Sequence, residues 1–328
     1  MGVDVAVKWG FLSTADINDK LLPGANASPD VDVVAVASRN LERARAYASE
    51  RGIERAYGSY DELFADPEIE AVYISLPNSM HVEWSIRALE AGKHVLCEKP
   101  LSRHPEDVER AFDAAEKAGR ILMEAFMYRH NPQTKRLVEL VEGSAIGRLR
   151  LVRAAFSFPL DDMTNVRLNA ELEGGGLMDV GSYCVSGSRL LAGEPESVYG
   201  EQVGAASGVD ELFTGNLRFP NGILGEIDCG LVLPVRDELE AIGEEGSIFL
   251  DDPWHCRKPV LEVRREDGTE RIELEPQDSY RLQLENMSAA LRGHAEPLLG
   301  REDALGQARA IEALYRSAGE GRPVMLTS

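Results

Sequence analysis

Five short apolar segments alternate with amphipathic stretches in the first 126 residues, and this alternation restricts the fold more than any other feature of the sequence. Each segment is nearly continuous in apolar and β-branched residues, which is typical of parallel strands that helices cover on both faces. Strands that alternate with helices build a parallel sheet, so we expect an α/β domain here. The segments lie at residues 3–11, 31–38, 71–77, 94–98 and 120–126.

Signals at helix ends agree with this prediction. Gly52 follows a helical pattern, and Ser59 and Glu62 have the spacing of a capping box at a helix start. Pro105 stands where a first helical turn would begin. Lys8 places a charge inside the first predicted strand, so we expect its ammonium group to pair with an acid or to reach solvent.

Longer strands of alternating polarity replace this pattern after about residue 148 and predict an antiparallel sheet. Asn221-Gly222 and Asp267-Gly268 each stand between two such strands, and these pairs supply the positive φ angles of tight hairpins.

Two helices, at 279–291 and 302–319, are expected to end the chain. A length of 328 residues exceeds what one hydrophobic core usually supports. We therefore expect two domains, 1–127 and 128–328, with the last helices free to pack back on the first domain.

The composition excludes several classes of protein. A formal net charge of −21 repels nucleic acid, and no apolar run approaches the roughly 20 residues that span a membrane. The N-terminus lacks the basic and then apolar layout of a secretion signal, so we expect a cytosolic protein. The four cysteines form no C-x-x-C pair, and we expect them to be reduced and mostly buried, without a zinc cluster.

The segment WGFLSTADI follows the first predicted strand, where a Rossmann domain turns tightly and places a pyrophosphate at a helix N-terminus. Ser13, Ala15 and Asn18 stand where the fingerprint has glycines, and the chain has a glycine only earlier, at Gly10. Small residues still admit a phosphate, and Ser13 and Thr14 carry hydroxyl donors. A phosphate loop and an ordinary strand-to-helix turn both fit this segment.

Ser38-Arg39-Asn40 follows the second predicted strand, where an acidic residue would bind the ribose hydroxyls of NAD. No carboxylate is present, and a serine hydroxyl beside a guanidinium suits a 2′-phosphate. The sequence therefore favours NADP over NAD. The alternative is an exposed arginine and a serine that caps the next helix.

Lys99 follows the fifth predicted strand, at the edge where open α/β sheets bind their ligands. Partial desolvation there would lower the pKa of the amine and let it exchange a proton. The alternative is a surface lysine paired with Glu98.

GGGLMDVGSY places Asp179 and Tyr183 four residues apart at the start of a predicted helix, so both side chains share one face. The three glycines would let the chain pass close to a flat ligand. A tyrosine hydroxyl can exchange a proton with a substrate oxygen, and Lys99 is the cation expected to lower the pKa of this phenol. A flexible turn, a capping aspartate and a core tyrosine form the alternative.

Six segments in this order resemble the Gfo/Idh/MocA family of oxidoreductases over nearly the whole chain: WGFLSTADI, ASRN, PNSMH, CEKPL, EAFMYRHNP and GGGLMDVGSY. The resemblance is closest to a branch of NADP-dependent aldose (xylose-type) dehydrogenases, dihydrodiol dehydrogenases and sugar ketoreductases. It implies a Rossmann domain with a parallel sheet, an α+β domain with an open, mostly antiparallel sheet, and an active site between them. It also implies a homodimer or homotetramer that pairs through the second sheet.

The family's motifs assign roles to individual residues. By resemblance, Lys99 reaches the nicotinamide and the reacting oxygen, and Glu98 lines the cofactor site. Tyr183 stands at the acid/base position, and Asp179 binds or orients the substrate. Tyrosine rather than histidine at that position favours the aldose dehydrogenase and ketoreductase branch.

Further segments are expected to contact the cofactor or the substrate, although His81 equally fits a helix face and Tyr128 with Arg129 equally fit a structural role. The expected cofactor contacts are Gly10, Ser13, Thr14, Ala15, Ser38, Arg39, Leu76, Pro77, Asn78, His81, Glu98, Lys99 and Arg167, and the expected substrate contacts are Tyr128, Arg129, Asp179 and Tyr183.

The resemblance implies an oxidoreductase that transfers hydride between NADP(H) and a sugar or polyol, with an aldose 1-dehydrogenase as the leading expectation. A keto-sugar reductase or a trans-dihydrodiol dehydrogenase is the alternative within the family. An NADP-binding sensor or scaffold without turnover is the alternative from another class, since a fold does not fix a function. No metal is expected, because Lys99 can polarise the substrate oxygen.

Overall fold

The computed structural model describes residues 5–326, so the start of the first predicted strand, at Val3, lies outside the described residues. The chain divides into two compact units. The first comprises residues up to Ser102, Glu106–His130 and Asp278–Ala304, and the second comprises Arg103–Pro105, Asn131–Gln277 and the residues from Leu305 on. The boundary at residues 127 and 128 and the cytosolic location stay predictions.

The first unit contains a six-stranded sheet in which every neighbouring pair is parallel. The strand order 3-2-1-4-5-6 is that of a Rossmann fold, which confirms the predicted α/β architecture. In spatial order the strands are β3 (Arg55–Tyr57), β2 (Val31–Ala37), β1 (Val7–Leu12), β4 (Ala71–Ile74), β5 (His94–Cys97) and β6 (Leu122–Glu124).

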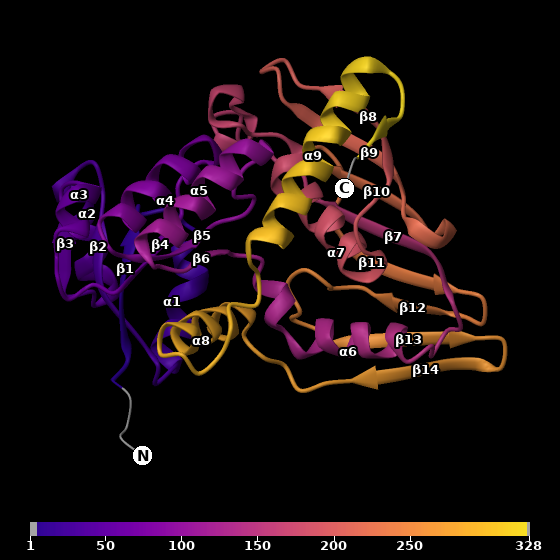
Figure 1. Ribbon diagram of the computed structural model, residues 1–328, viewed down its shortest axis with the longest axis horizontal. Coiled ribbons are helices and arrows are strands. Elements are labelled where there is room, and N and C mark those ends of the chain that lie inside the picture. The colour runs from indigo at the N-terminus through magenta and orange to yellow at the C-terminus, as the bar shows by residue number, and fades with distance from the viewer. Residues whose placement is uncertain (1–4, 327–328) are drawn as a thin grey trace. The chain divides into compact units, whose positions relative to one another are not determined.

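Helices pack on this sheet, and α8 from the C-terminal part of the chain lies beside α1 (Figure 1). The sequence missed β3, because three residues at a sheet edge give no periodicity, and it missed α1. The helices are α1 (Asn18–Ala27), α2 (Leu41–Arg51), α3 (Tyr60–Phe64), α4 (His81–Glu90), α5 (Pro105–Ala118) and α8 (Ser279–Leu291), with short 3₁₀ turns η1 (Asn78–Met80) and η2 (Met127–His130).

The predicted helix ends are confirmed. Gly52 ends α2 in the left-handed conformation with φ 70°, and the Ser59 side chain accepts the backbone N–H of Glu62 at the start of α3. The ammonium group of Lys8 pairs with Glu68 at 3.0 Å, which satisfies the charge inside β1.

The second unit contains a nine-stranded sheet, and among the strands the structure describes only β7 and β10 pair in parallel. This confirms the expected open, mostly antiparallel sheet. In spatial order the strands are β14 (Gly268–Glu273), β13 (Val260–Arg265), β12 (Ser247–Leu250), β11 (Arg236–Gly243), β7 (Leu149–Ser157), β10 (Leu224–Gly230), β9 (Asp210–Arg218), β8 (Ser197–Gly204) and β15 (Val324–Met325).

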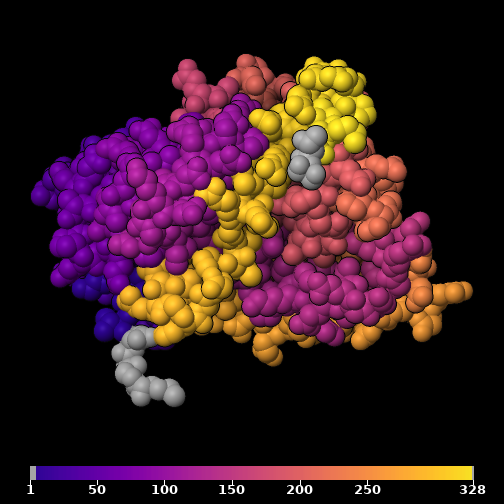
Figure 2. All heavy atoms as spheres, in the orientation of Figure 1, coloured from indigo at the N-terminus to yellow at the C-terminus, as the bar shows by residue number. Residues whose placement is uncertain are grey.

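Two hairpins in this sheet were expected. Asn221 and Gly222 join β9 to β10 with φ angles of 62° and 75°, as predicted. In the second, Arg265 pairs with Gly268, so Glu266 and Asp267 form the turn and the glycine begins β14. The β13–β14 hairpin projects at the edge of this unit (Figures 1 and 2).

Helix α7 packs on the middle of the nine-stranded sheet, against β7, β10 and β11, while α6 packs on β13. The sheet face opposite α7 is polar, because outward residues such as Arg153 and Glu226 form ion pairs across neighbouring strands. The helical segments are α6 (Pro132–Glu142), η3 (Val166–Leu168), η4 (Ala170–Leu172), the π-helical η5 (Leu177–Gly181), α7 (Ser182–Ala192), η6 (Pro220–Gly222) and α9 (Arg301–Glu320).

The four cysteines are buried and unpaired with one another, as expected. Burial raises the pKa of the Cys97 and Cys229 thiols, which keeps them protonated and unreactive. No helix in the described part of the chain has the length and apolar character needed to cross a membrane.

His94 opens β5 and is held in its neutral form. The backbone N–H of Ile121 donates to its Nδ1 at 3.0 Å, and burial, reinforced by the nearby Arg120 charge, lowers the pKa of His94 to about 4. A histidine in the unfolded chain takes up its proton near pH 6.5. The unfolded state therefore binds more protons between about pH 4 and 6.5, and the free energy of unfolding falls as pH drops through that window.

We expect His94→Asn to weaken this dependence, because its amide oxygen can accept the Ile121 N–H without taking up a proton. The drop in Tm between pH 7 and pH 5 should shrink, because unfolding of the variant takes up about one proton fewer in this pH range. His104→Asn, a change at a half-exposed histidine, is the control and should keep the drop. An identical pH dependence in His94→Asn and the unmodified protein would contradict the assignment.

Candidate functional site

The predicted cofactor residues of the first unit follow the carboxyl ends of its parallel strands. Ser13 to Ala15 follow β1, Ser38 and Arg39 follow β2, Leu76 to Asn78 follow β4, and Glu98 and Lys99 follow β5. Because all these strands run in one direction, their ends lie along one edge of the sheet, where Rossmann folds bind dinucleotides.

Ser13 takes the place of a fingerprint glycine and adopts a glycine-like φ of 98°. Its hydroxyl lies 2.9 Å from Ser75 Oγ and accepts the Ala15 N–H, and its carbonyl accepts from the Asn18 amide at 2.9 Å. These bonds explain how a serine tolerates this backbone, and they direct its hydroxyl to Ser75. Gly10 lies in β1, where a Cβ would sit 2.9 Å from the Leu63 side chain, so the glycine leaves room for that side chain. Its contact with the cofactor stays a prediction.

The loop after β2 concentrates positive charge. Asn40 caps α2 by accepting the Arg43 N–H at 3.0 Å, so the helix cap is Asn40, whereas the alternative interpretation of the sequence had Ser38 in that role. Burial raises the pKa of Tyr60, and the positive charges of Arg39 and Arg43 partly offset this rise by favouring the phenolate. Two guanidinium groups therefore lie near Tyr60 at this strand end, which suits a phosphate.

Glu98 is held by its neighbours at the end of β5. The Tyr73 hydroxyl donates to Glu98 Oε1 at 2.5 Å, and the backbone N–H of Lys99 donates to Oε2 at 3.3 Å. The carboxylate is thereby fixed between β4 and the start of the Lys99 loop.

His81 connects two loops at this edge. The residue is 1 % exposed, and its ring nitrogens lie 2.8 Å from the carbonyl oxygens of Pro100 and Leu76. The histidine therefore ties the loop after β4 to the loop that carries Lys99, and its cofactor contact stays a prediction.

Tyr128 and Arg129 lie in η2, which contacts α8. Tyr128 is buried edge-on against Phe126, and Arg129 pairs with Asp303 at 3.2 Å. These contacts agree with the structural alternative for both residues, and their contact with a sugar stays a prediction.

The second unit brings Arg167, Asp179 and Tyr183 together around η5 and α7. Arg167 Nε donates to Asp179 Oδ2 at 2.5 Å, so two residues that the sequence identified separately form one ion pair. Asp179 lies in η5, and Tyr183 lies one turn further on, in the first turn of α7. This matches the predicted spacing on a shared helical face.

Aromatic rings surround Tyr183. Phe156 of β7 meets its ring edge-on at a centroid distance of 5.4 Å, and Trp254 lies against it at 6.0 Å. Trp254 is itself fixed, because its indole N–H donates to the Ala155 carbonyl oxygen. No local sequence pattern indicates this contact, because the tryptophan lies 71 positions away in a loop.

The glycines before η5 are needed for close contacts within the protein. A Cβ on Gly174 would overlap the Arg167 carbonyl, and one on Gly175, whose φ is 124°, would overlap Asp210 Oδ1. In the structure these glycines let the backbone pass close to Arg167 and Asp210. From the sequence we expected them to let it pass close to a flat ligand.

Asp210 holds the start of this helical segment. Its Oδ2 accepts the Leu177 N–H at 2.6 Å, and its Oδ1 accepts from the Tyr315 hydroxyl at 2.7 Å. Burial raises the pKa of Asp210 despite these bonds. Asp210 and Tyr315 hold the segment that carries Asp179 and Tyr183, and sequence analysis missed both of them.

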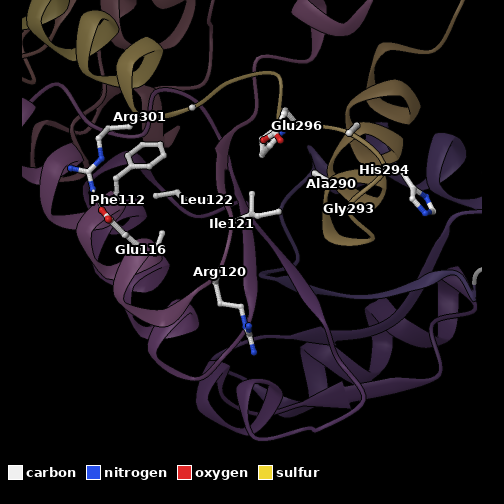
Figure 3. Close-up of a pocket in the computed structure, with 14 residues that line it drawn as sticks. Phe112, Glu116, Arg120, Ile121, Leu122, Ala290, Gly293, His294, Glu296 and Arg301 are labelled. Atoms are coloured by element: carbon white, nitrogen blue, oxygen red, sulfur yellow. Dashed lines mark hydrogen bonds and ion pairs between the residues drawn. The ribbon is translucent and has the colours of Figure 1, made fainter.

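A cavity of about 700 Å³ lies elsewhere in the first unit, between α5, β6 and the segment after α8 (Figure 3). Arg120, Ile121 and Leu122 line it, so it lies at the amino end of β6. None of the predicted site residues lines this cavity, and we do not assign it to the cofactor.

We expect Asp210→Ala to loosen the segment that carries Asp179 and Tyr183. It leaves the buried Leu177 N–H and the Tyr315 hydroxyl without their acceptor, at a cost of about 1–3 kcal/mol each. Hydrogen exchange in a peptide covering residues 174–192 should accelerate by roughly 10-fold or more.

Asp210→Asn is the matched control. Its amide oxygen can accept the Leu177 N–H, and the tyrosine hydroxyl can rotate to accept from the amide nitrogen. Exchange in this control should stay near that of the unmodified protein, and equal protection in Asp210→Ala would contradict the role of Asp210.

Two family models match the chain. The model described as "Oxidoreductase family, NAD-binding Rossmann fold" matches residues 8–126, and the "GFO/IDH/MocA C-terminal domain" matches residues 134–249.

Curated relatives match along nearly the full length. D-xylose 1-dehydrogenase (NADP(+)) 2 of Haloferax volcanii is 38% identical over 326 residues, covering 97% of this chain and 99% of the relative. A dTDP-3,4-didehydro-2,6-dideoxy-alpha-D-glucose 3-reductase of Actinomadura kijaniata is 30% identical, and the match covers 95% of this chain and 96% of the relative. A trans-1,2-dihydrobenzene-1,2-diol dehydrogenase of Danio rerio is 33% identical, covering 78% of each chain.

Solved structures agree with these relatives. The aldose-aldose oxidoreductase of Caulobacter crescentus, solved with glycerol, superposes with a TM-score of 0.92 at 28% identity, covering 98% of this chain and 100% of that one. The 3-ketoreductase KijD10 of Actinomadura kijaniata, solved with NADP and TDP-benzene, superposes with a TM-score of 0.90 at 29% identity. The match covers 95% of this chain and 98% of that one. The fold, both family models and the full-length relatives agree: the chain belongs to the Gfo/Idh/MocA family of oxidoreductases.

Proposed function

We propose that this oxidoreductase transfers hydride between NADP(H) and a hydroxyl-bearing or carbonyl carbon of a sugar, acting as an aldose 1-dehydrogenase. The observation that carries the proposal is the position of Tyr183, whose phenol is packed by aromatic rings one turn from the Asp179–Arg167 ion pair. Full-length similarity to a D-xylose 1-dehydrogenase (NADP(+)) supports the substrate class and the cofactor.

The residues at the strand ends of the first unit fit a dinucleotide. Ser13 keeps the backbone path of a glycine, which leaves room for a phosphate, and Arg39 with Arg43 provides positive charge after β2 without a ribose-binding carboxylate. We propose that Ser38 and Arg39 bind the 2′-phosphate of NADP, and that Thr14, Ala15 and the loop at 76–78 border the cofactor. When bound, the nicotinamide supplies the hydride acceptor or donor.

We propose that Tyr183 moves the proton. In oxidation its phenolate takes the proton of the substrate hydroxyl, and in reduction its hydroxyl returns that proton to the carbonyl oxygen. Asp179, fixed by Arg167, accepts from a substrate hydroxyl and orients the sugar. Lys99 supplies positive charge for the same reaction, which favours the phenolate and polarises the substrate oxygen.

One other catalytic function has specific support. A keto-sugar reductase would use the same groups in the opposite direction, and the similarity to KijD10 favours this candidate. Variants of a tyrosine and of a lysine in that enzyme have been solved with NADP, and we propose Tyr183 and Lys99 as the equivalent pair. A panel of aldoses and keto-sugars with NADP+ and NADPH, followed at 340 nm, distinguishes the two directions. Binding of NADPH without turnover of any sugar would instead indicate a sensor.

We also propose that the chain forms a homodimer or homotetramer through the polar face of its nine-stranded sheet. A hollow of about 470 Å³ on this face is lined by residues of β7, β9, β10, β11 and β12, including Arg153, Glu226 and Glu240. Side chains of both signs suit a self-complementary surface.

We expect Tyr183→Phe and Lys99→Ala each to lower kcat by at least about 100-fold, because each removes a group that handles the proton or the developing charge. Steady-state rates at 340 nm measure the effect. Tyr199→Phe, at a half-exposed position, and Lys20→Ala, at an exposed one, are the matched controls and should keep normal rates. Near-normal turnover in Tyr183→Phe would rule out its acid/base role.

We expect Arg39→Asp to shift the ratio of kcat/KM for NADP+ over NAD+ by at least about 10-fold toward NAD+, since it removes a charge-assisted bond to the 2′-phosphate. Arg45→Asp, at an exposed position in α2, should leave the ratio unchanged. An unaltered ratio in Arg39→Asp would remove the support for the 2′-phosphate contact.

A further inference from the structure

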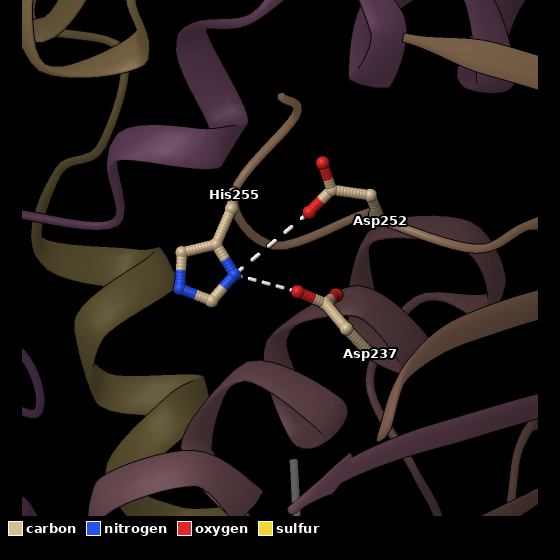
Figure 4. A group of neighbouring side chains, drawn as sticks. All are labelled: Asp237, Asp252 and His255. Atoms are coloured by element: carbon tan, nitrogen blue, oxygen red, sulfur yellow. Dashed lines mark hydrogen bonds and ion pairs between the residues drawn. The ribbon is translucent and has the colours of Figure 1, made fainter. Parts of the chain in front are cut away.

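The loop between β12 and β13 presents a histidine that the proposed mechanism does not use (Figure 4). His255 Nδ1 lies 2.6 Å from Asp237 Oδ2, and Asp237 belongs to β11. The Asp237 side chain is 8 % exposed, whereas that of His255 is 37 % exposed. A buried carboxylate therefore holds one nitrogen of a ring that reaches the surface.

The loop itself is held rigid. Asp252 Oδ2 accepts the backbone N–H groups of Arg257 and Lys258 at 2.5 and 2.8 Å, and its carbonyl oxygen accepts that of Cys256 at 3.0 Å. Asp237 Oδ1 accepts the Trp254 N–H at 3.2 Å. The position of the His255 ring is thus set by the protein before any ligand binds, which lowers the entropy cost of using it in binding.

The His255 ring and the Tyr183 ring both contact the same aromatic residue, Phe156. Phe156 meets the His255 ring edge-on at 5.5 Å and the Tyr183 ring edge-on at 5.4 Å. Trp254, the residue before His255, stacks on Phe156 and lies against Tyr183. The loop that packs Tyr183 therefore also carries the imidazole, and Phe156 contacts both rings.

A metal ion is the other ligand that this cluster suggests. One ligand atom each from Asp237, Asp252 and His255 lies within 4.8 Å of the others. The Arg257 guanidinium, however, lies 3.3 Å from Asp252 Oδ1 and 3.8 Å from Asp237 Oδ2, so the protein already supplies the positive charge. The second oxygen of each carboxylate accepts backbone N–H groups. The cluster is therefore built to orient the imidazole.

We propose that His255, oriented by Asp237, binds a hydroxyl of the substrate at the end remote from the carbon that reacts at Tyr183. Because Nδ1–H donates to the carboxylate, Nε2 is left as an acceptor, and a substrate hydroxyl donates to it. The contact would select polyhydroxylated substrates over simple alcohols. This inference rests on the proposed function, since it assigns the second end of the same substrate.

The test compares His255→Phe with the unmodified enzyme, because phenylalanine keeps the edge-on ring contact with Phe156 and removes both nitrogens. The probes are the best aldose from the sugar panel and its monodeoxy analogues. We expect the variant to raise KM for the aldose by roughly 10- to 100-fold while kcat and the dissociation constant of NADPH stay near normal.

One deoxy analogue should behave differently from the rest. The sugar that lacks the hydroxyl bound by His255 should have a higher KM than the aldose with the unmodified enzyme. Its KM should not rise further in His255→Phe, because the contact that the variant removes is already absent in this sugar. Lys258→Met, in the same loop at an exposed position, should keep the normal KM and so controls for a disturbed loop.

The outcomes separate the two proposals. An unchanged KM in His255→Phe, or an equal loss for every analogue, would overturn the role of His255 and leave the proposed function standing. Absence of sugar turnover by the unmodified enzyme would overturn both. Circular dichroism of His255→Phe establishes that a raised KM comes from a folded protein.

Discussion

The proposed chemistry of the second unit depends on one buried carboxylate. Asp210 accepts the Leu177 N–H and the Tyr315 hydroxyl, and so holds the start of the helical segment that carries Asp179 and Tyr183. A charge is costly to bury, and burial raises the pKa of Asp210 accordingly. The bonds offset that cost, and Gly175 cannot carry a side chain because its Cβ would collide with this carboxylate.

The first unit uses a different constraint, the common direction of its parallel strands. Loops that are far apart in sequence reach one edge because every strand ends there, and short bonds then fix them to one another. Tyr73 holds Glu98 from the neighbouring strand, and His81 joins the loop after β4 to the loop that carries Lys99. The groups proposed for the chemistry are thus supported by buried partners that need not contact a ligand.

Much of the fold was predictable because its signals are local. The apolar segments gave the strands of the parallel sheet, and Gly52, Ser59 and Asn221 marked turns and helix ends that the structure confirms. The edge strand β3 was missed, since three residues carry no period. The family resemblance was also visible, because six motifs in order are hard to produce by chance, and the comparisons confirm it.

The sequence by itself determined the α/β class and the oxidoreductase family, since these depend on patterns and motifs read along the chain. The same motifs predict which residues serve the chemistry. Only the tertiary structure decided what holds those residues. Asp210 and Tyr315 are 105 positions apart, and Trp254 and His255 lie in a loop without a motif, so no local pattern connects them to Tyr183. Their contacts form when strands and helices pack, and packing brings together residues whose separation along the chain carries no signal.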